Sequence, residues 1–367
     1  MSKYLSRVLI FICLSLSRIC LSGQTLPERQ ETLPTEKYAN PNCNGIKSQN
    51  VRVVFYNTEN LYDPYDDTTK LDNEFTAKGK NRWTFSKFSV KLAHLAKTMM
   101  AIGGHDLPAL IGLSEIENRY VMNKIIYESP LKKLHYRFIH YESPDARGID
   151  VALLYRPEKF KLISSLAIRI QFPFDTNLRT RDILYVRGIL FQEDTLHVFV
   201  NHWPSRLGGM IESEVKRKFV ASVLKEYVDS ILRNNNQSNI LIMGDFNDEP
   251  DQPSIKEILH SGPVHQDIHP DELVNLMYDQ QKDWTHGTIK YQGKWTIIDQ
   301  FIVSGSMISN ETGLCTSPKD ARIFQPDFLM EKETTFLGSK PLRTYAGPRY
   351  IGGFSDHLPI YLDIWKR

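Results

Sequence analysis

The chain of 367 residues has few cysteines and lacks the short motifs that mark several common enzyme classes. It contains no HExxH, no paired CxxC, no GxSxG and no glycine-rich phosphate loop. Zinc peptidases, serine hydrolases and P-loop proteins would therefore lack their central residues. Of the four cysteines, Cys13 and Cys20 lie within the first 23 residues. The other two, Cys43 and Cys315, form one disulfide in an oxidising compartment or stay as two thiols.

No apolar run is long enough to cross a bilayer. Two basic residues precede the apolar residues 8–14, and Arg18 interrupts the stretch well before the roughly 20 residues that a spanning helix needs. A charged start, a short apolar run and a zone of small and polar residues are typical of a secretory signal peptide. We expect residues 1–23 to be such a signal and the protein to be exported, either periplasmic or secreted. Lipidation at Cys20 is the less favoured alternative.

Neither basic nor acidic residues are in clear excess. The chain has 45 basic and 43 acidic residues, a formal net charge of +2. Residues 1–23 hold three basic residues and no acid, so removing them leaves 42 basic and 43 acidic residues. A protein that holds nucleic acid through its overall field is usually clearly basic. Any contact with a polyanion must therefore be local.

The pattern of apolar residues predicts a flexible leader followed by one layered α/β domain. Residues 24–49 are polar, contain prolines and show no periodicity. Apolar stripes predict helices over 88–102, which ends at Gly103-Gly104, and over 212–233. Short apolar runs predict strands at 51–56, 110–113, 151–155, 184–190, 196–200, 240–243, 297–303 and 358–364. Because strands and helices alternate without a linker, residues 50–367 are expected to form a single domain.

Polar residues gather at the ends of these predicted strands. The positions are Asn57, Glu115, Asn201-His202, Asp245 with Asn247, Asp299, and Asp356-His357. Strand ends are where a rigid sheet presents side chains to a shared edge. Four of these sites follow a strand and two lie at or near a strand start. They can meet only if some strands run antiparallel to others, so we expect mixed sheets.

The residue types at these positions suit metal-assisted proton transfer. Asn57, Glu115 and Asp356 offer the oxygen ligands that Mg²⁺ or Mn²⁺ prefers, with Ca²⁺ as a further candidate. His202 and His357 supply groups that exchange protons near neutral pH. A carboxylate commonly fixes the orientation of an imidazole, and Asp299 is the candidate partner of His357.

Six motifs in order resemble the endonuclease/exonuclease/phosphatase superfamily, over about residues 51–365. They are NTENLYD (57–63), IGLSEIEN (111–118), NHWPSR (201–206), GDFNDEP (244–250), IIDQFIV (297–303) and FSDHLPI (354–360). The resemblance implies a four-layered α/β/β/α sandwich, in which two mixed sheets pack face to face with helices outside. It also implies that the protein is a metal-dependent phosphoesterase.

The resemblance also carries roles onto matching residues. Glu115 resembles the metal-binding glutamate, with Asn57 beside it and Asp356 as a further ligand. Asp245 resembles the aspartate that positions or deprotonates the attacking water, and Asn247 the asparagine that holds a phosphate oxygen. His357 and Asp299 resemble the pair beside the scissile phosphate. His202 takes the place of the histidine found in deoxyribonuclease-like members, and Asp150 lies near the position of the carboxylate partner of that histidine. Arg181 and Asn201 are the candidates for contact with the substrate.

Several neighbouring residues have a plainer interpretation. We expect Glu59 and Glu117 to be solvated neighbours of the site residues, and we expect His140 to have no role in the site. The segment 340–354 interleaves arginines with tyrosines. Such a segment either contacts a nucleic-acid substrate or packs a long loop onto the domain.

The favoured function is hydrolysis of a phosphate ester by in-line attack of water, with nucleic acid as the first candidate substrate and a nuclease-like endonuclease as the first candidate activity. The alternative is a phosphatase or a phospholipase-C-like enzyme acting on a small-molecule or lipid ester, because the superfamily contains both kinds. A non-catalytic binding protein is less favoured, since the chief positions are all filled, and so is a lectin or adhesin on an unrelated sandwich. We expect a monomer without a membrane span.

Overall fold

The computed structural model describes residues 49–206 and 208–367, all of which belong to one compact unit. The predicted signal peptide and residues 24–48 of the predicted leader lie outside the described residues, and so does Cys43. Cys315 is buried in a short strand. Among the described helices, none is long and apolar enough to cross a membrane.

The first sheet has seven strands and is mixed. Its strand order is β14-β20-β1-β2-β4-β3, and β15 also pairs with β20. The strands are β1 (Gln49–Leu61), β2 (Leu110–Ile116), β3 (Arg137–His140), β4 (Asp150–Tyr155), β14 (Leu314–Cys315), β15 (Ala321–Ile323) and β20 (Ile360–Lys366). β1 and β2 are parallel, and every other pair is antiparallel. The start of β20 therefore pairs with Phe55 of β1, two residues before Asn57.

The second sheet also has seven strands and is mixed, in the order β5-β6-β7-β8-β13-β10-β9. Its strands are β5 (Phe160–Ile168), β6 (Ile183–Leu190), β7 (Asp194–His202), β8 (Asn239–Asp245), β9 (Ser261–Gly262), β10 (Leu273–Asn275) and β13 (Asp299–Ser304). β7 and β8 are parallel, whereas β13 runs antiparallel to β8. The start of β13 is thus beside the ends of β7 and β8, as the predicted mixed sheets require.

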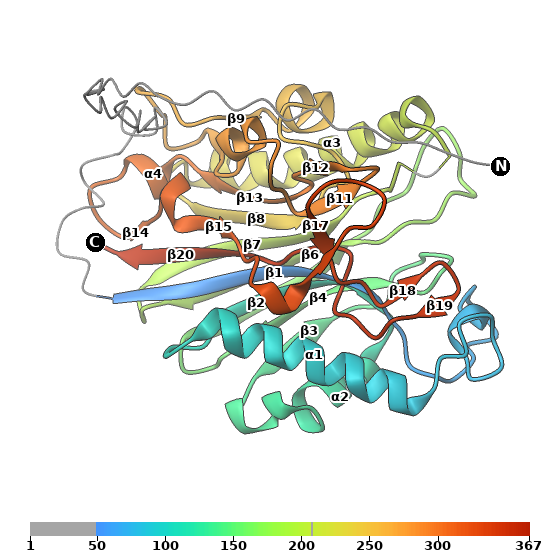
Figure 1. Ribbon diagram of the computed structural model, residues 1–367. Helices are drawn as coiled ribbons and strands as arrows, with labels where there is room; N and C mark the ends of the chain where they lie inside the picture. The colour runs from blue at the N-terminus through green and yellow to red at the C-terminus, as the bar shows by residue number, and fades with distance from the viewer. Residues whose placement is uncertain (1–48, 207) are drawn as a thin grey trace, which may run out of the picture. The chain divides into compact units, whose positions relative to one another are not determined.

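Alternation along each strand divides the apolar residues between two faces. In β1, Val53 and Phe55 enter the core between the two sheets, where they join residues of the second sheet such as Met243 and Phe301. Their neighbours on β1 face the other way and form a second core with the helices α1 (Phe85–Gly103) and α2 (Arg119–Tyr127). A third core lies between the second sheet and α3 (Met210–Asn234). The four layers seen in Figure 1 confirm the predicted α/β/β/α sandwich.

The long helices follow the predicted stripes with one correction. The side chain of Thr84 accepts the Lys87 N–H and begins α1, and Gly104, with a φ of 58°, ends it. In α3 the apolar stripe that begins at Val215 and continues through Phe219, Val223 and Val228 is partly wrong as a buried face, because Val215 is 54% exposed. The buried face of α3 is Val220, Ala221, Leu224, Val228 and Leu232, together with the polar residues Ser213 and Arg217. The apolar periodicity of this face is interrupted by Arg217, which is charged although it is buried.

Shorter elements extend from the second sheet and the chain's last third. They are α4 (Ser306–Ser309) and three hairpins, namely β11 (Ile289–Tyr291) with β12 (Lys294–Thr296), β16 (Met330–Lys332) with β17 (Ser339–Pro341), and β18 (Tyr345–Ala346) with β19 (Arg349–Tyr350). A bridge between Ile289 and His357 ties the first hairpin to the segment before β20.

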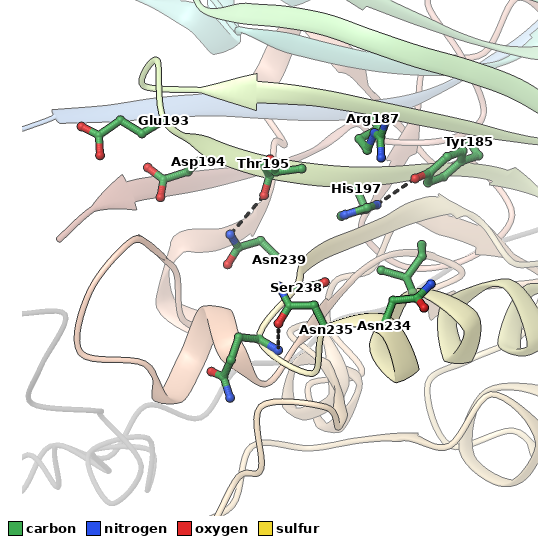
Figure 2. A pocket seen from close by; sticks show the side chains of 12 residues that line it. Tyr185, Arg187, Glu193, Asp194, Thr195, His197, Asn234, Asn235, Ser238 and Asn239 are labelled. Carbon is green, nitrogen blue, oxygen red and sulfur yellow. Dashed lines mark hydrogen bonds between the residues drawn. The ribbon is translucent and has the colours of Figure 1, made fainter.

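A pocket of about 550 Å³ lies where β7 and β8 begin (Figure 2). Thr195 and His197 of β7 and Asn239 of β8 line it, beside the C-terminal end of α3. The Tyr185 hydroxyl and His197 Nδ1 are 2.8 Å apart and share a hydrogen bond. Because β7 and β8 are parallel, this pocket lies at the opposite end of the sheet from His202 and Asp245.

The imidazole in this pocket makes stability sensitive to acid. Burial lowers the pKa of His197 to about 4, and the charge of Arg187 adds to the effect. The ordinary value near 6.5 applies in the unfolded chain, so unfolded molecules take up the proton first as pH falls. Stability from this group is therefore intact above pH 6.5 and is lost between about pH 6.5 and pH 4. We expect His197→Gln to lose less thermal stability than the wild type between pH 7 and pH 5, measured by circular dichroism. Equal losses would contradict this assignment.

Candidate active site

The predicted site residues meet at one end of both sheets. In the second sheet, Asp245 pairs in register with His202 of β7 and with Asp299 of β13. In the first sheet, Asn57 of β1 pairs with Ser114 of β2, next to Glu115. The Ser355 hydroxyl donates to the backbone oxygen of Asn57 at 2.8 Å and so fixes the segment before β20 beside β1. The convergence expected from the strand ends is present.

The carboxylate of Asp245 is the centre of this convergence. Asn57 Nδ2 donates to Asp245 Oδ2 at 3.0 Å. The same oxygen lies 3.6 Å from His202 Nε2 and 3.8 Å from His357 Nε2. All four side chains are buried, and they come from both sheets. The other oxygen, Oδ1, accepts the Asn247 N–H at 2.9 Å.

His357 is held by Asp299 in the manner predicted from the sequence. Its Nδ1 lies 2.8 Å from Asp299 Oδ2, and both side chains are almost fully buried. A proton on Nδ1 that is donated to the carboxylate leaves Nε2 facing Asp245. The His357 backbone N–H is also fixed, because it donates to the Ser355 hydroxyl at 3.1 Å.

The two histidines have opposite electrostatic environments. Burial alone would lower the pKa of His357, but the Asp299 and Asp245 carboxylates outweigh it and raise that pKa well above the ordinary value. Burial lowers the pKa of His202 well below its ordinary value, and the positive charges of Arg181 and Arg147 add to this. Burial also raises the pKa of Asp245 to about 7. The two imidazoles therefore differ in how readily they hold a proton.

Glu115 reaches the site because its strand is irregular. The register of β2 shifts between Ser114 and Ile116, and Glu115 has a φ of 60°. A bulge of this kind redirects a side chain without ending the strand. Glu115 Oε2 accepts the Asn60 N–H at 2.7 Å, and Oε1 lies 3.8 Å from His202 Nε2.

The donor set fits a hard divalent cation. Glu115 and Asp356 offer carboxylate oxygens, and both remain partly exposed, by 13% and 29% of their side chains. Acidic side chains here outnumber the basic ones, and Asp299 Oδ1 is buried without a hydrogen-bond partner among the described residues. Ligand atoms of Asp245, Asp299 and His357 also lie within 4.8 Å of one another. An excess of buried negative charge of this kind is stabilised by a bound cation.

Two of the predicted substrate contacts are not supported. Arg181 is buried and donates from Nε to the His202 backbone oxygen at 3.2 Å, from Nη1 to Asp145 at 3.1 Å and from Nη2 to the Trp203 backbone oxygen at 2.5 Å. Asn201 is fully buried and accepts the Trp203 indole N–H at 3.1 Å. Both side chains bind the end of β7 and the residue that follows it. Asn247 is less buried, and its Nδ2 donates to the Trp203 backbone oxygen at 3.0 Å.

The proposed partner of His202 was also wrong. Asp150 lies 3.1 Å from Nε2 of His140, a residue for which no role was expected, and accepts the Ser143 N–H at 2.9 Å. His202 Nδ1 is buried without a hydrogen-bond partner among the described residues. The ligand atoms of His140, Glu142 and Asp150 lie within 4.8 Å of one another, at the end of β3 and the start of β4.

The environments of Glu59 and Glu117 were misjudged from the sequence, and Lys91 was missed. Glu59, expected to be solvated, is 7% exposed and lies 3.7 Å from the buried Lys91 of α1. Glu59 also binds Arg343, at 3.2 Å, and Arg343 Nη2 donates to Asp356 at 2.9 Å. Glu117 is buried as well and accepts the Asp63 N–H at 2.6 Å. The available signal was Lys91 itself, which lies one turn from the apolar Phe88 and Leu95 on the buried face of a helix.

Comparison with known proteins places this geometry in a family. A family model described as "Endonuclease/Exonuclease/phosphatase family" matches residues 52–366. The chain belongs to the endonuclease/exonuclease/phosphatase family. No curated protein sequence matches it. As a member of this family, the chain is a phosphoesterase of a divalent-metal-dependent class.

Solved structures share the fold at low sequence identity. Humanized D. rerio TDP2 is 14% identical, with a TM-score of 0.51 over 86% of this chain and 98% of that one. The human Nocturnin catalytic domain is 16% identical, with a TM-score of 0.52 over 86% and 95%. A family member from Bacteroides thetaiotaomicron is 12% identical, with a TM-score of 0.51 over 87% and 96%. At these identities the likeness concerns the fold alone.

The structural role of Arg181 can be tested against the predicted substrate contact. Arg181→Ala removes the buried ion-pair partner of Asp145, which keeps only the more exposed Arg147 at 3.7 Å. Breaking a buried ion pair typically costs about 3–5 kcal/mol. We expect a comparable fall in the free energy of unfolding, measured by urea denaturation. Arg179→Ala, two residues away and exposed, is the matched control and should change stability by less than about 0.5 kcal/mol. A stable Arg181→Ala protein that has only a raised KM would restore the substrate-contact interpretation.

Proposed function

We propose that the protein is a nuclease-like phosphodiesterase that hydrolyses nucleic acid by in-line attack of water, with Mg²⁺ or Mn²⁺ as its cofactor. The observation that carries this proposal is the Asp245 carboxylate, buried between His202 and His357 with Glu115 at its side. One carboxylate flanked by a protonated and a neutral imidazole is equipped to move a proton in each direction.

The side chains have distinct tasks in this proposal. Asp245 orients the attacking water and draws its proton. His357, protonated and fixed by Asp299, donates a hydrogen bond from Nε2 to the reacting phosphate and gives that proton to the leaving oxygen as the ester P–O bond breaks. His202, neutral at the start, lies within reach of Asp245 and Glu115 and takes over from Asp245 the proton that came from the water. The remaining Nδ2 hydrogen of Asn247 is the candidate donor to a further phosphate oxygen.

A divalent cation would be held by Glu115, with Asn57 and Asp356 as further oxygen donors. When bound, it supplies positive charge that neutralises the phosphoryl and leaving oxygens. Titration of the protein with EDTA should remove activity, and Mg²⁺ or Mn²⁺ should restore it.

Nucleic acid is the preferred substrate on two grounds. His202 occupies the place at which deoxyribonuclease-like members of the family have a histidine. One of the similar structures is D. rerio TDP2, described as complexed with single strand DNA product. A phosphatase or a phospholipase-C-like enzyme remains the alternative, because these activities occur in the same family.

The site assignment is tested by two substitutions and a control. Glu115→Gln and His357→Ala each remove a group that acts on the reacting phosphate, so we expect kcat to fall by about 10²–10⁴-fold. Plasmid nicking in Mg²⁺ or Mn²⁺ is the measurement, and circular dichroism checks the fold. His105→Ala, at an exposed histidine, should behave as the wild type. Full activity in both site variants would show that the chemistry lies elsewhere.

The identity of the ester is tested with a substrate panel. Purified protein is offered plasmid DNA, RNA, sphingomyelin and phosphorylated sugars in Mg²⁺ or Mn²⁺. Turnover of either nucleic acid is the expected result. Turnover of another ester, with both nucleic acids left intact, would replace the nuclease proposal with the alternative.

We also propose that the protein is exported and acts in the periplasm or outside the cell. The support is the N-terminal sequence pattern. Protein recovered from the periplasm or the medium should begin at about Gln24, as read by N-terminal sequencing. Recovery of cytoplasmic protein that still begins at Met1 would contradict export.

A further inference from the structure

Two segments from opposite ends of the chain carry basic residues and no acid. Residues 78–91 contain Lys78, Lys80, Arg82, Lys87 and Lys91. Residues 338–351 contain Lys340, Arg343 and Arg349. In a chain whose charges nearly balance, such runs mark places where the local field is positive.

The structure brings these two segments together. The Tyr345 hydroxyl donates to the Asn81 backbone oxygen at 2.9 Å. Lys87 Nζ lies over the rings of Tyr350 and Tyr345, at 4.6 Å and 5.5 Å from their centroids. Lys91 Nζ donates to the Thr344 hydroxyl. The β18–β19 hairpin is therefore fixed against the start of α1.

A pocket of about 410 Å³ opens between the segments. Its lining includes Asn60, Phe75, Asn81 and Tyr345, and two ion pairs, Arg343 with Glu59 and Lys80 with Glu74. Asn60 donates its backbone N–H to Glu115, and Arg343 binds Asp356, so the pocket begins beside two proposed metal ligands. Its volume falls within the range of about 300–1,000 Å³ that is usual for small-molecule sites.

The aromatic walls of this pocket are held rigidly. Phe75 stacks on Tyr62 with ring centroids 4.3 Å apart. Tyr345 packs against Trp83 at 6.1 Å and against Tyr350 at 5.4 Å. Rings that are already fixed lose little conformational freedom when a planar group stacks on them.

The cations around the pocket are largely uncompensated. Lys78, Arg82 and Arg349 are exposed and make no ion pair within residues 49–206 and 208–367. Lys80 pairs with Glu74 at 3.2 Å, but both side chains are more than half exposed. An exposed pair of this kind contributes little and is readily exchanged for another anion.

We propose that this pocket and the basic strip, defined as Lys78, Lys80, Arg82, Arg343 and Arg349, bind the nucleic-acid strand that flanks the scissile phosphate. The base of the adjacent nucleotide stacks in the pocket, and the phosphates beyond it contact the strip. The inference rests on the proposed function and narrows it. The substrate is then a polynucleotide with several phosphates, as opposed to an isolated ester.

A nucleic acid fits these features better than an anionic membrane does. Membrane binding by a surface segment depends on protruding apolar side chains as well as on basic residues. The pocket is recessed, and the most exposed large apolar side chains, Leu337 at 96% and Trp284 at 81%, are not among its lining residues. A recess with aromatic walls and a cationic rim suits a base joined to phosphates.

The test is a double charge reversal, Lys80→Glu with Arg349→Glu. Binding of a fluorescein-labelled 12-nucleotide oligothymidylate is measured by anisotropy in EDTA, between 20 and 200 mM NaCl. The salt slope is the slope of log K against log[NaCl], and each lost phosphate contact on a single strand reduces its magnitude by about 0.7. For two lost contacts we expect a reduction of about 1.4, and we expect binding at least tenfold weaker at low salt. Lys132→Glu with Lys133→Glu reverses two exposed lysines elsewhere and should stay within about twofold of the wild type.

A kinetic measurement separates this inference from the proposed function. For the same proteins in Mg²⁺ or Mn²⁺, kcat/KM is compared between the 12-mer and bis(p-nitrophenyl) phosphate. In the Lys80→Glu, Arg349→Glu variant, the ratio of kcat/KM for the 12-mer to kcat/KM for bis(p-nitrophenyl) phosphate should fall about tenfold. The cause should be a higher KM for the 12-mer. One contrary outcome is that the wild type cleaves the 12-mer while the Lys80→Glu, Arg349→Glu variant keeps the wild-type affinity, salt slope and ratio of kcat/KM values. In that case the strip is not the strand site, and the nuclease proposal stands.

Two further outcomes distinguish the binding inference from the nuclease proposal. If the wild type binds the 12-mer through the strip but cleaves only other esters, the binding inference stands and the nuclease proposal fails. If the wild type instead binds vesicles of phosphatidylcholine with phosphatidylglycerol and not the 12-mer, the inference is overturned. Lys80→Gln with Arg349→Gln serves as a milder pair, in case the double reversal disturbs the fold seen by circular dichroism.

Discussion

The site depends on a single buried carboxylate placed where the two sheets meet. Burial raises the pKa of Asp245 to about 7, which shows how poorly the unpartnered charge would be tolerated there. Asn57 from the first sheet and the two histidines supply the polar contacts that make this position possible. The packing of sheet against sheet therefore sets the distances at which the reactive groups face one another. A shift of either sheet would separate donors from acceptors.

The loops around this carboxylate have strained backbone conformations. Glu59, Glu115 and Asn247 all have positive φ, at 52°, 60° and 51°, although none is glycine. Such conformations cost about 1–3 kcal/mol each and persist only where surrounding structure imposes them. Here the imposing structure is the register of β1 and β2, which shifts at these residues, and the turn after β8. The strain turns the side chains of Glu59 and Glu115 toward the site.

The strands, the four layers and the meeting of the polar motifs could be predicted because they follow from local periodicity and from motifs at strand ends. The partners of individual charged residues could not. Arg181 binds backbone oxygens that only the finished turn after β7 presents, and Asp150 selects His140 because β3 and β4 are neighbours. Glu59 lies within a motif, but its burial depends on Lys91, which lies in another layer. Choices of this kind are made by tertiary packing, which a linear pattern does not contain.

The near-neutral net charge of the chain does not argue against a polyanionic substrate, because the charges are sorted in space. Buried acids gather at the strand ends, where a cation is needed, and uncompensated basic residues lie at the rim beside Arg343. Arg343 belongs to both groups, since it pairs with Glu59 and Asp356 and also lines the pocket. At physiological ionic strength, fields decay over about 8 Å. A phosphate at the rim therefore responds to the arginines and lysines next to it and is little affected by the total charge of the protein.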